Sequence, residues 1–490
     1  MRQAGVLLHI SSLPGPGGMG CLGKEAYEFA DFLHKAGMKI WQVLPMGPTG
    51  YGESPYQSTS VYAGNPRLIS LRLLREEGLV DFADGEECVP VSEAKCDFDA
   101  VSATREALLR RCFRQSEDKL ASEVNAFRRE EPWVDDFALF TAVKRSFHNV
   151  LWTAWPDRGI RMREEESLKW YRQTLAEEIR FHIFCQYLFS RQWYAFKKYC
   201  NSLGIQLFGD MPIYVSEDSA DCWTHPEVFQ LDEERVPRRV AGVPPDYFSA
   251  DGQLWGNPLY RWERQRMHGY GWWVERMKHM AKMYDLIRID HFIGFANYYS
   301  VAHGAPNARH GKWVVGPGGH LFDVLKEKVP EAHIIAEDLG AQNDRVKKLL
   351  AYVGYPGMRV LEFGFGGDDD NRDLPANYVK NCVAYTGTHD NDTVRGFVDT
   401  AKPRVLAHAQ KVLGFKKPEE AAPAFVKAVM ECEADTAMFP MQDLLGLDGT
   451  CRMNMPGTLG GNWAWRMLPG AATDELAEQL RAMLKKARRL

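Results

Sequence analysis

Charged and titratable side chains interrupt the apolar segment YDLIRIDHFIGF, residues 284 to 295. In a strand, successive side chains point to opposite faces, so Arg288 and Asp290 share one face while Ile287 and Ile289 share the other. A guanidinium beside a carboxylate favours the ionised form that a nucleophile requires. Taken alone, the same pair also fits a structural ion pair at the end of a strand.

Two later apolar runs also end in carboxylates, Glu337 in AHIIAEDLG and Asp390 in NCVAYTGTHDNDT. Glu337 has apolar neighbours and no adjacent cation, so partial removal from water raises its pKa, which suits a general acid. A plainer interpretation remains open for each segment, because Asp338 or Asp392 fits the cap of a following helix.

The elements that must position these groups are short apolar runs that end in polar or Gly/Pro-rich loops. They lie at residues 5–12, 39–48, 205–215, 284–292, 332–340, 357–365, 381–390 and 451–457. Helical patterns separate most of the runs, which is typical of parallel strands joined by crossover helices. Eight such units predict an α/β fold, a (β/α)8 TIM barrel, as a single catalytic domain over residues 1–490. Active sites of such barrels lie at the carboxyl ends of the strands, where Asp210, Asp290, Glu337 and Asp390 would converge.

Two segments are too long for ordinary connections and predict insertions. Residues 50 to 204, after the second run, are strongly helix-periodic and predict a mostly helical subdomain. Residues 216 to 270, after the third run, are rich in Pro, Gly and aromatic residues and predict a loop-rich lid over the site.

Composition excludes several classes of function. A net charge of -5 with both signs interspersed argues against nucleic acid as a partner. No window approaches the roughly 20 apolar residues of a membrane span, and the first apolar run is too short for a signal peptide, so we expect a cytoplasmic protein. The 10 cysteines form no C-x-x-C pair, which favours reduced thiols. No phosphate-binding glycine motif is present, and we expect no cofactor.

Three carboxylates that converge on one barrel mouth favour glycoside chemistry, which needs a nucleophile, an acid/base and groups that hold sugar hydroxyls. Many of the 14 tryptophans lie beside Gly, Pro or polar residues, which suits apolar sugar faces, although packing in the core is the default interpretation for any single Trp. A metal-dependent barrel enzyme is one alternative, supported by His291 and His389, although Arg288 beside Asp290 argues against a cation there. A sugar-binding protein without catalytic activity is another.

The motifs RIDHFIGF, IIAEDLG and GTHDNDT, in this order, closely resemble the 4-alpha-glucanotransferase family, also called amylomaltase or disproportionating enzyme, of the alpha-amylase superfamily. Further matches are SSLPGPGGMGCLG, GESPYQSTSVYAGNP, GDMPIYVSEDSADCW, GVPPDYFSADGQLWGNPLY and MNMPGTLGGNWAWR. The resemblance spans essentially the whole chain.

The resemblance implies a retaining transfer of alpha-1,4-glucan segments between maltodextrins derived from starch or glycogen, with glucose as acceptor or product and no metal. It implies Asp290 as nucleophile, Glu337 as general acid and base, and Asp390 as the carboxylate that stabilises the transition state. The substrate-binding residues that it implies are Tyr56, Asp210, Trp255, Arg288, His291, His389 and Asn462. An alpha-glucan hydrolase on the same barrel remains the alternative, since both reactions share their first half.

Overall fold

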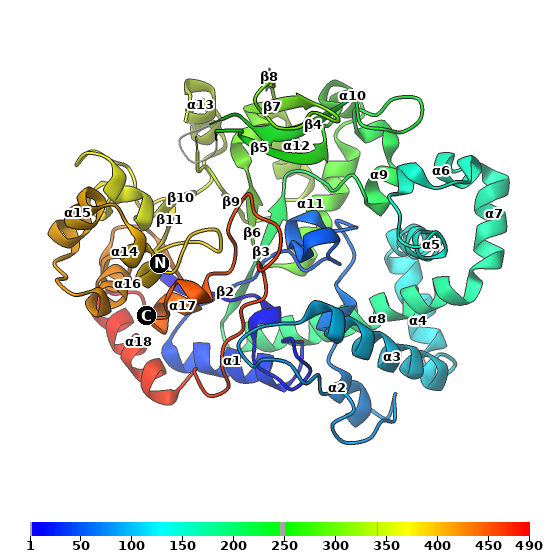
Figure 1. Cartoon of the computed structure of the whole chain (residues 1–490), viewed down its shortest axis with the longest axis horizontal. Coiled ribbons are helices and arrows are strands. Elements are labelled where there is room, and N and C mark those ends of the chain that lie inside the picture. The colour runs from blue at the N-terminus through cyan, green and yellow to red at the C-terminus, as the bar shows by residue number, and fades with distance from the viewer. Residues whose placement is uncertain (1, 246–249, 341) are drawn as a thin grey trace.

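The computed structural model describes residues 2–245, 250–340 and 342–490, which contain a closed barrel of parallel strands (Figure 1). Around the barrel the strands follow the order β1-β12-β11-β10-β9-β6-β3-β2. Their bounds are β1 (Gln3–Leu7), β2 (Ile40–Gln42), β3 (Gln206–Pro212), β6 (Leu286–Asp290), β9 (Ile334–Ala336), β10 (Gly357–Val360), β11 (Cys382–Tyr385) and β12 (Thr436–Pro440). The predicted (β/α)8 barrel is therefore confirmed.

Apolar side chains pack against one another inside the barrel. They form a cluster of their own, separate from the large core between strands and helices: Ile40, Phe208, Ile335, Met358, Val360, Val383, Tyr385 and Met438. The Tyr385 hydroxyl donates to Gln42 Oε1 at 2.9 Å inside this layer. Polar side chains nearer the carboxyl ends of the strands therefore rest against a closely packed apolar layer, which limits their movement.

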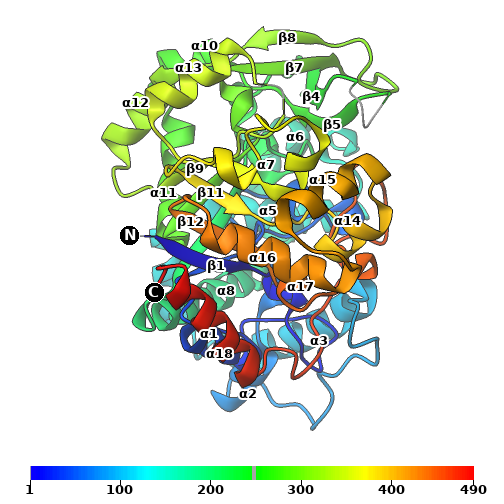
Figure 2. The same ribbon diagram turned by 90° about the vertical axis from the view of Figure 1, so that its left-hand side faces the viewer.

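Helices surround the barrel and separate most successive strands. They are α1 (Lys24–Ala36), α8 (Ala176–Ser202), α11 (Gly271–Met283), α12 (Gly319–Lys328), α13 (Asp344–Val353), α14 (Val394–Thr400), α15 (Pro403–Leu413), α16 (Ala421–Glu431), α17 (Met441–Leu444) and α18 (Asp474–Lys486). Both termini lie on the same side of the molecule, where β1 begins and α18 ends (Figure 2). There the buried Arg489 guanidinium donates to the carbonyls of Gln3 and Asp435, which precede or begin adjacent strands.

The long connection between β2 and β3 contains a group of helices that ends in α8, the helix that returns to the barrel wall (Figure 1). The helices before α8 are α2 (Leu71–Glu76), α3 (Phe98–Ser116), α4 (Ala121–Glu130), α5 (Trp133–Ser146), α6 (Arg158–Met162) and α7 (Glu165–Thr174).

The segment over residues 216 to 270 contains more regular structure than a loop-rich lid. It contains α9 (Ala220–Thr224), β4 (Arg239–Val243), β5 (Gln253–Pro258) and α10 (Trp262–Met267), while residues 246–249 lie outside the described part. With β7 (Asn297–Ala302) and β8 (Lys312–Val315), which follow β6, the strands form a four-stranded sheet in the order β5-β4-β7-β8. The sequence did not reveal this sheet, because its strands come from two separate connections.

The eighth strand was predicted at residues 451–457, and this prediction is wrong. The strand is β12 (Thr436–Pro440), which only four residues without a Gly or Pro, residues 432–435, separate from α16. Residues 451–457 instead form a loop, in which the N–H of Asn454 donates to the carbonyl of His389 at 3.1 Å. Within the described ranges, no helix has the length and apolar character needed to cross a membrane.

Candidate active site

Arg288 joins two carboxylates at the carboxyl ends of neighbouring strands. Asp210 on β3 pairs in register with Arg288 on β6, and Arg288 Nε donates to Asp210 Oδ1 at 3.0 Å. Arg288 Nη2 lies 2.9 Å from Asp210 Oδ2 and donates to Asp290 Oδ1 at 2.7 Å. The guanidinium is therefore shared between a carboxylate with no exposed surface, Asp210, and one whose side chain is 29% exposed, Asp290.

The charge on Asp290 depends on opposing influences. Burial raises the pKa of its carboxyl well above the ordinary value, Arg288 lowers it, and the charges of Asp210 and Glu337 raise it. The sequence-based expectation that Arg288 favours the ionised form describes only one of these influences. The hydrogen bond that Arg288 donates stabilises the carboxylate form of Asp290, which is the nucleophilic one.

Glu337 lies beside Asp290 on the next strand. Ile289 of β6 pairs with Ala336 of β9, so the residues that follow, Asp290 and Glu337, reach the mouth at the same level. Adjacent strands lie about 4.8 Å apart. The main-chain N–H groups of His291 and Leu339 donate to Glu337 Oε2 and Oε1, each at 2.7 Å.

The environment of Glu337 sets its protonation near neutrality. Burial raises the pKa of its carboxyl to about 7, although Arg288 and the two main-chain donors lower it. A carboxyl group with this pKa holds a proton for a leaving group and then accepts one at neutral pH, which a general acid and base must do.

Asp390 belongs to the loop between β11 and α14 and points toward two groups from the last part of the chain. Asn454 Nδ2 donates to Asp390 Oδ1 at 2.6 Å, and Arg452 Nη2 donates to the Asp390 carbonyl at 2.6 Å. His389 Nε2 lies 3.4 Å from the same Oδ1. Sequence reasoning missed Asn454, although it was present in the quoted motif MNMPGTLGGNWAWR, because only the structure shows which loop it meets.

The Tyr56 hydroxyl connects the two sides of the mouth. It donates to Asp210 Oδ2 at 2.7 Å, lies 2.9 Å from His389 Nε2, and accepts from Arg288 Nη2 at 3.4 Å. The Tyr56 and His389 rings are stacked, with centroids 5.2 Å apart and planes 16° apart. The Trp463 ring lies 5.8 Å from Tyr56, so this tryptophan belongs to the same aromatic wall.

His291 and Trp255 form the opposite wall. His291 directly follows Asp290 in a left-handed conformation, with φ 50°. Its ring meets the Trp255 ring edge-on, with centroids 4.8 Å apart. Burial lowers the pKa of His291 to about 4, so the imidazole is neutral at neutral pH and has one N–H to donate.

Asn462 is the one predicted site residue whose described hydrogen bonds all stay within its own loop. Asn462 Nδ2 donates to Thr458, and its Oδ1 accepts from the N–H of Met455 at 3.0 Å. Its place in substrate binding stays a prediction.

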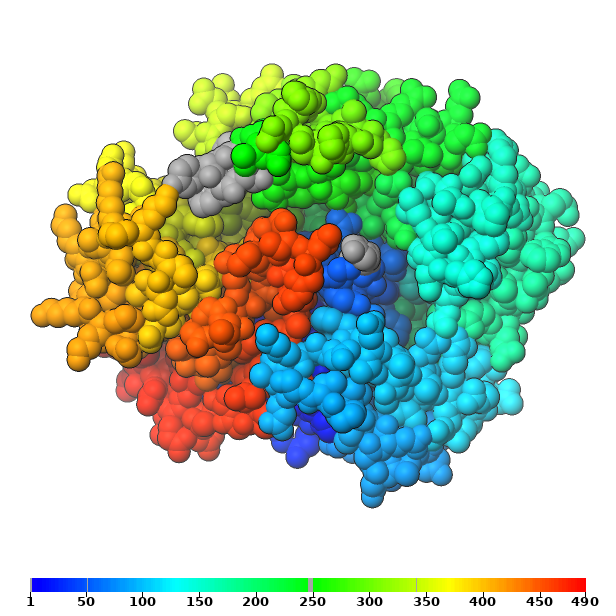
Figure 3. All heavy atoms as spheres, viewed as in Figure 1, coloured from blue at the N-terminus to red at the C-terminus, as the bar shows by residue number. Residues whose placement is uncertain are grey.

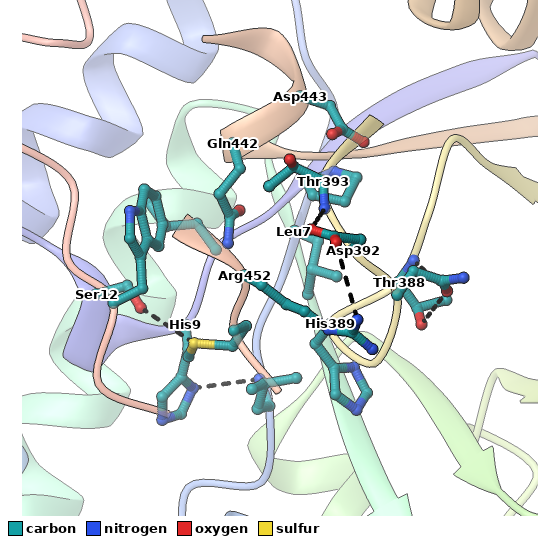
Figure 4. Close-up of a pocket in the computed structure, with 16 residues that line it drawn as sticks. Leu7, His9, Ser12, Thr388, His389, Asp392, Thr393, Gln442, Asp443 and Arg452 are labelled. Carbon is teal, nitrogen blue, oxygen red and sulfur yellow. Dashed lines mark hydrogen bonds and ion pairs between the residues drawn. The ribbon is translucent and has the colours of Figure 1, made fainter. Parts of the chain in front are cut away.

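Two hollows adjoin these side chains. One, of about 420 Å³ including open solvent, has His389 in its wall. Its other polar lining residues include His9, Thr388, Asp392 and Gln442 (Figure 4). The other, of about 570 Å³ including open solvent, has Tyr56 and Asp210 in its wall. In the space-filling view, a recess lies between the orange-red segment and the green segments above it (Figure 3).

The alternative of a metal-dependent enzyme needs a set of metal ligands. Within the described ranges, no group of three or more His, Cys, Asp and Glu side chains is placed to hold a metal ion. His389 Nε2 instead faces the Tyr56 hydroxyl. A (β/α)8 barrel with Asp290 and Glu337 at the ends of adjacent strands, and with Asp390 in the loop after β11, is typical of the class of enzymes that act on glycosidic bonds.

Comparison with known proteins identifies the family within this class. The sequence model of the 4-alpha-glucanotransferase family matches residues 8–472. The 4-alpha-glucanotransferase of Thermus thermophilus is 46% identical over 100% of this chain and 99% of its own length. The chloroplastic/amyloplastic 4-alpha-glucanotransferase of Solanum tuberosum is 40% identical over 99% of this chain and 86% of its own. The structure of the Streptococcus agalactiae amylomaltase in complex with acarbose superposes with a TM-score of 0.97, at 41% identity and 100% coverage of both chains.

The chain belongs to the 4-alpha-glucanotransferase family, and it is an enzyme that transfers glucan segments. The predicted family and activity are therefore confirmed.

Proposed function

We propose that this enzyme moves alpha-1,4-glucan segments between maltodextrins by a retaining double displacement, with Asp290 as nucleophile and Glu337 as acid and base. One observation carries the proposal: Asp290 and Glu337 follow directly after paired residues of adjacent parallel strands. A retaining mechanism needs carboxyl groups about 5 to 5.5 Å apart, which suits neighbouring strands about 4.8 Å apart.

In the first half-reaction, an Asp290 oxygen attacks the anomeric carbon while the bond from that carbon to the leaving oxygen breaks. Glu337 gives its proton to the leaving oxygen, and a covalent glycosyl-enzyme forms. In the second half-reaction, the 4-hydroxyl of an acceptor glucan attacks the same carbon, Glu337 takes the proton of that hydroxyl, and Asp290 is released as a carboxylate.

The surrounding residues hold the reacting sugar. Asp390, fixed by Asn454, accepts hydrogen bonds from sugar hydroxyls that strengthen as positive charge develops on the ring. The stacked Tyr56 and His389 rings form an apolar face for the sugar, while neutral His291 donates a hydrogen bond from the other side. Asp210 accepts a hydrogen bond from Arg288 and so keeps this guanidinium beside Asp290.

Substrates of this site are maltodextrins from starch or glycogen, with glucose as acceptor or product. A relative of very similar fold is an amylomaltase in complex with acarbose, and we infer that this site binds acarbose as well. We place the reaction in the cytoplasm, since the 10 cysteines are free thiols, which suit a reducing compartment.

Incubation with maltotriose and chromatography of the products test this proposal. Transfer gives released glucose and a ladder of chains longer than the substrate. Glucose and maltose without longer chains would mean that water takes the glycosyl group, as in a hydrolase. In the same assay Asp290→Ala should lose transfer by at least about 10⁴-fold, with an unchanged melting temperature to show that the barrel is intact. An active Asp290→Ala variant would refute the assignment of the nucleophile.

A further inference from the structure

Glu362 is a buried carboxyl group directly beneath the loop that carries Asp390, residues 386–393, which we call the Asp390 loop. Glu362 follows β10 in the short 3-10 helix η8 (Leu361–Gly366) and is 7% exposed. Its N–H donates to the carbonyl of Thr386 at 3.3 Å. A Cβ on Gly387 would lie only 2.7 Å from Glu362 Oε1, so the carboxyl packs against the backbone of the loop.

A continuous chain of hydrogen bonds leads from Glu362 to Asp390. Asn391 Nδ2 donates to Glu362 Oε2 at 3.1 Å. Asn391 Oδ1 accepts from Thr388 twice, from the N–H at 3.0 Å and from the hydroxyl at 2.8 Å. The Thr388 hydroxyl then accepts from the N–H of Asp390 at 3.3 Å. Because both bonds from Thr388 end on Asn391 Oδ1, the Asn391 amide is oriented with its Nδ2 toward Glu362.

The reaction itself leaves Glu362 without a role. Its Oε1 has no hydrogen-bond partner among the described residues. Burial and the nearby Asp443 raise the pKa of the Glu362 carboxyl well above its ordinary value. A buried carboxyl group with a single side-chain partner is a costly arrangement, and its one evident effect among the described residues is on Asn391.

Asp443 of α17, labelled in Figure 4, bonds to residues at both ends of the same loop. Its Oδ2 accepts from the Thr386 hydroxyl at 2.5 Å, and its Oδ1 accepts from the N–H of Val394 at 2.8 Å. Asp443 thus fixes the ends of the loop, and its middle is held from two sides, by Arg452 and Asn454 on one and by the Asn391–Glu362 contact on the other.

We propose that Glu362 is a positioning residue for glucan transfer, which holds Asp390 in place through Asn391 and Thr388. This inference rests on the proposed role of Asp390. A catalytic group displaced by about 1 Å loses up to about 100-fold in rate, so loss of this support should lower kcat.

The test compares Glu362→Leu, Asn391→Ala, the double variant and Glu362→Gln, with kcat and KM measured on maltotriose. Glu362→Leu and Asn391→Ala should each lower kcat by about 10- to 100-fold. The double variant should fall no further than the lower single variant, because both changes break one chain. Glu362→Gln should stay within about threefold of the parent enzyme, since the neutral amide still accepts from Asn391.

The matched control is Glu131→Leu, the same change at a buried glutamate of the helical insertion, which contacts Trp133 and Lys282. It should lower the melting temperature but leave kcat unchanged.

Parent-like kcat in Glu362→Leu, or a double variant as slow as the product of both single losses, would overturn the inference. If Glu362→Leu does not fold, Glu362→Asp replaces it, because shortening the side chain withdraws the acid from Asn391; parent-like kcat there overturns the inference too.

The parent enzyme and Asp390→Asn separate this result from failure of the proposed function. If the parent makes no ladder from maltotriose, or Asp390→Asn transfers at full rate, the proposed function fails and the inference fails with it. If both behave as expected and the Glu362 variants keep full kcat, the inference alone is refuted.

Discussion

The N–H of His291 donates to Glu337 Oε2 at 2.7 Å, which ties the candidate acid/base to the residue immediately after the candidate nucleophile. A second N–H, from Leu339, holds the other oxygen. Main-chain donors are fixed by the barrel, so the Glu337 carboxyl keeps its position while it loses and regains a proton. Its protonation then follows its own pKa, and this determines how the reaction responds to pH.

We predict that kcat/KM for maltotriose falls above pH 7. Burial raises the pKa of Glu337 to about 7, so the protonated acid is present below that pH and decreases about tenfold per unit above it.

For a donor with a good leaving group, such as an α-maltosyl fluoride, formation of the glycosyl-enzyme needs no proton. Glu337→Gln should therefore slow this step far more for maltotriose than for the fluoride, which a rapid-quench measurement of that step compares. Equal losses on the two donors would exclude Glu337 as the acid.

The same carboxyl should lower the stability of the fold at alkaline pH. Its folded pKa of about 7 lies above the ordinary glutamate value, so this group destabilises the fold progressively as pH rises between the two values. At pH 8 the cost is about 3 kcal/mol, and at pH 5 it is below about 1 kcal/mol. Glu337→Gln removes it, so urea unfolding should show the variant gaining stability over the parent as pH rises. A difference that does not change with pH would contradict this.

Sequence reasoning found the parts of the site that local pattern determines. Asp290 and Glu337 were predictable because each follows a short apolar run, and the end of such a run is where a barrel strand meets the mouth. Asn454 and Glu362 were not, because their importance comes from contacts with the Asp390 loop, which is distant in sequence. Nothing in a linear pattern specifies which two loops meet above a barrel.

The same limit explains the errors in the fold. The strand β12 was missed because four residues without Gly or Pro separate it from α16, and only its pairing with β1 and β11 distinguishes it. The four-stranded sheet was missed because its strands β4 and β7 pair across the intervening barrel strand β6.

Arg489 should be a major contributor to stability at the closed end of the barrel. It is 1% exposed, and its guanidinium donates to the carbonyls of Met430, Cys432 and Ala434 as well as to Gln3 and Asp435. Arg489→Gln leaves several buried carbonyls without partners, so we expect a loss of at least about 3 kcal/mol in urea unfolding. The neighbouring Arg488 is exposed, and Arg488→Gln should cost less than about 0.5 kcal/mol. Equal unfolding midpoints for the two variants would refute the role of Arg489.

Asn454 and Asn462 lie in one segment of the chain, but the structure predicts different effects for their removal. Asn454 Nδ2 donates to Asp390 Oδ1 at 2.6 Å, so Asn454→Ala frees a carboxylate that must be in place as charge develops on the sugar. A hydrogen bond to a charged group contributes about 1.5 to 3 kcal/mol, so kcat on maltotriose should fall by about 10- to 100-fold. The hydrogen bonds described for Asn462 all lie within its own loop, to Thr458 and Met455. If it also binds substrate, as the family resemblance implies, Asn462→Ala raises KM and leaves kcat within about threefold. A larger loss of kcat in Asn462→Ala than in Asn454→Ala would reverse these assignments, because it would mean that Asp390 depends on the shape of the loop more than on its direct partner.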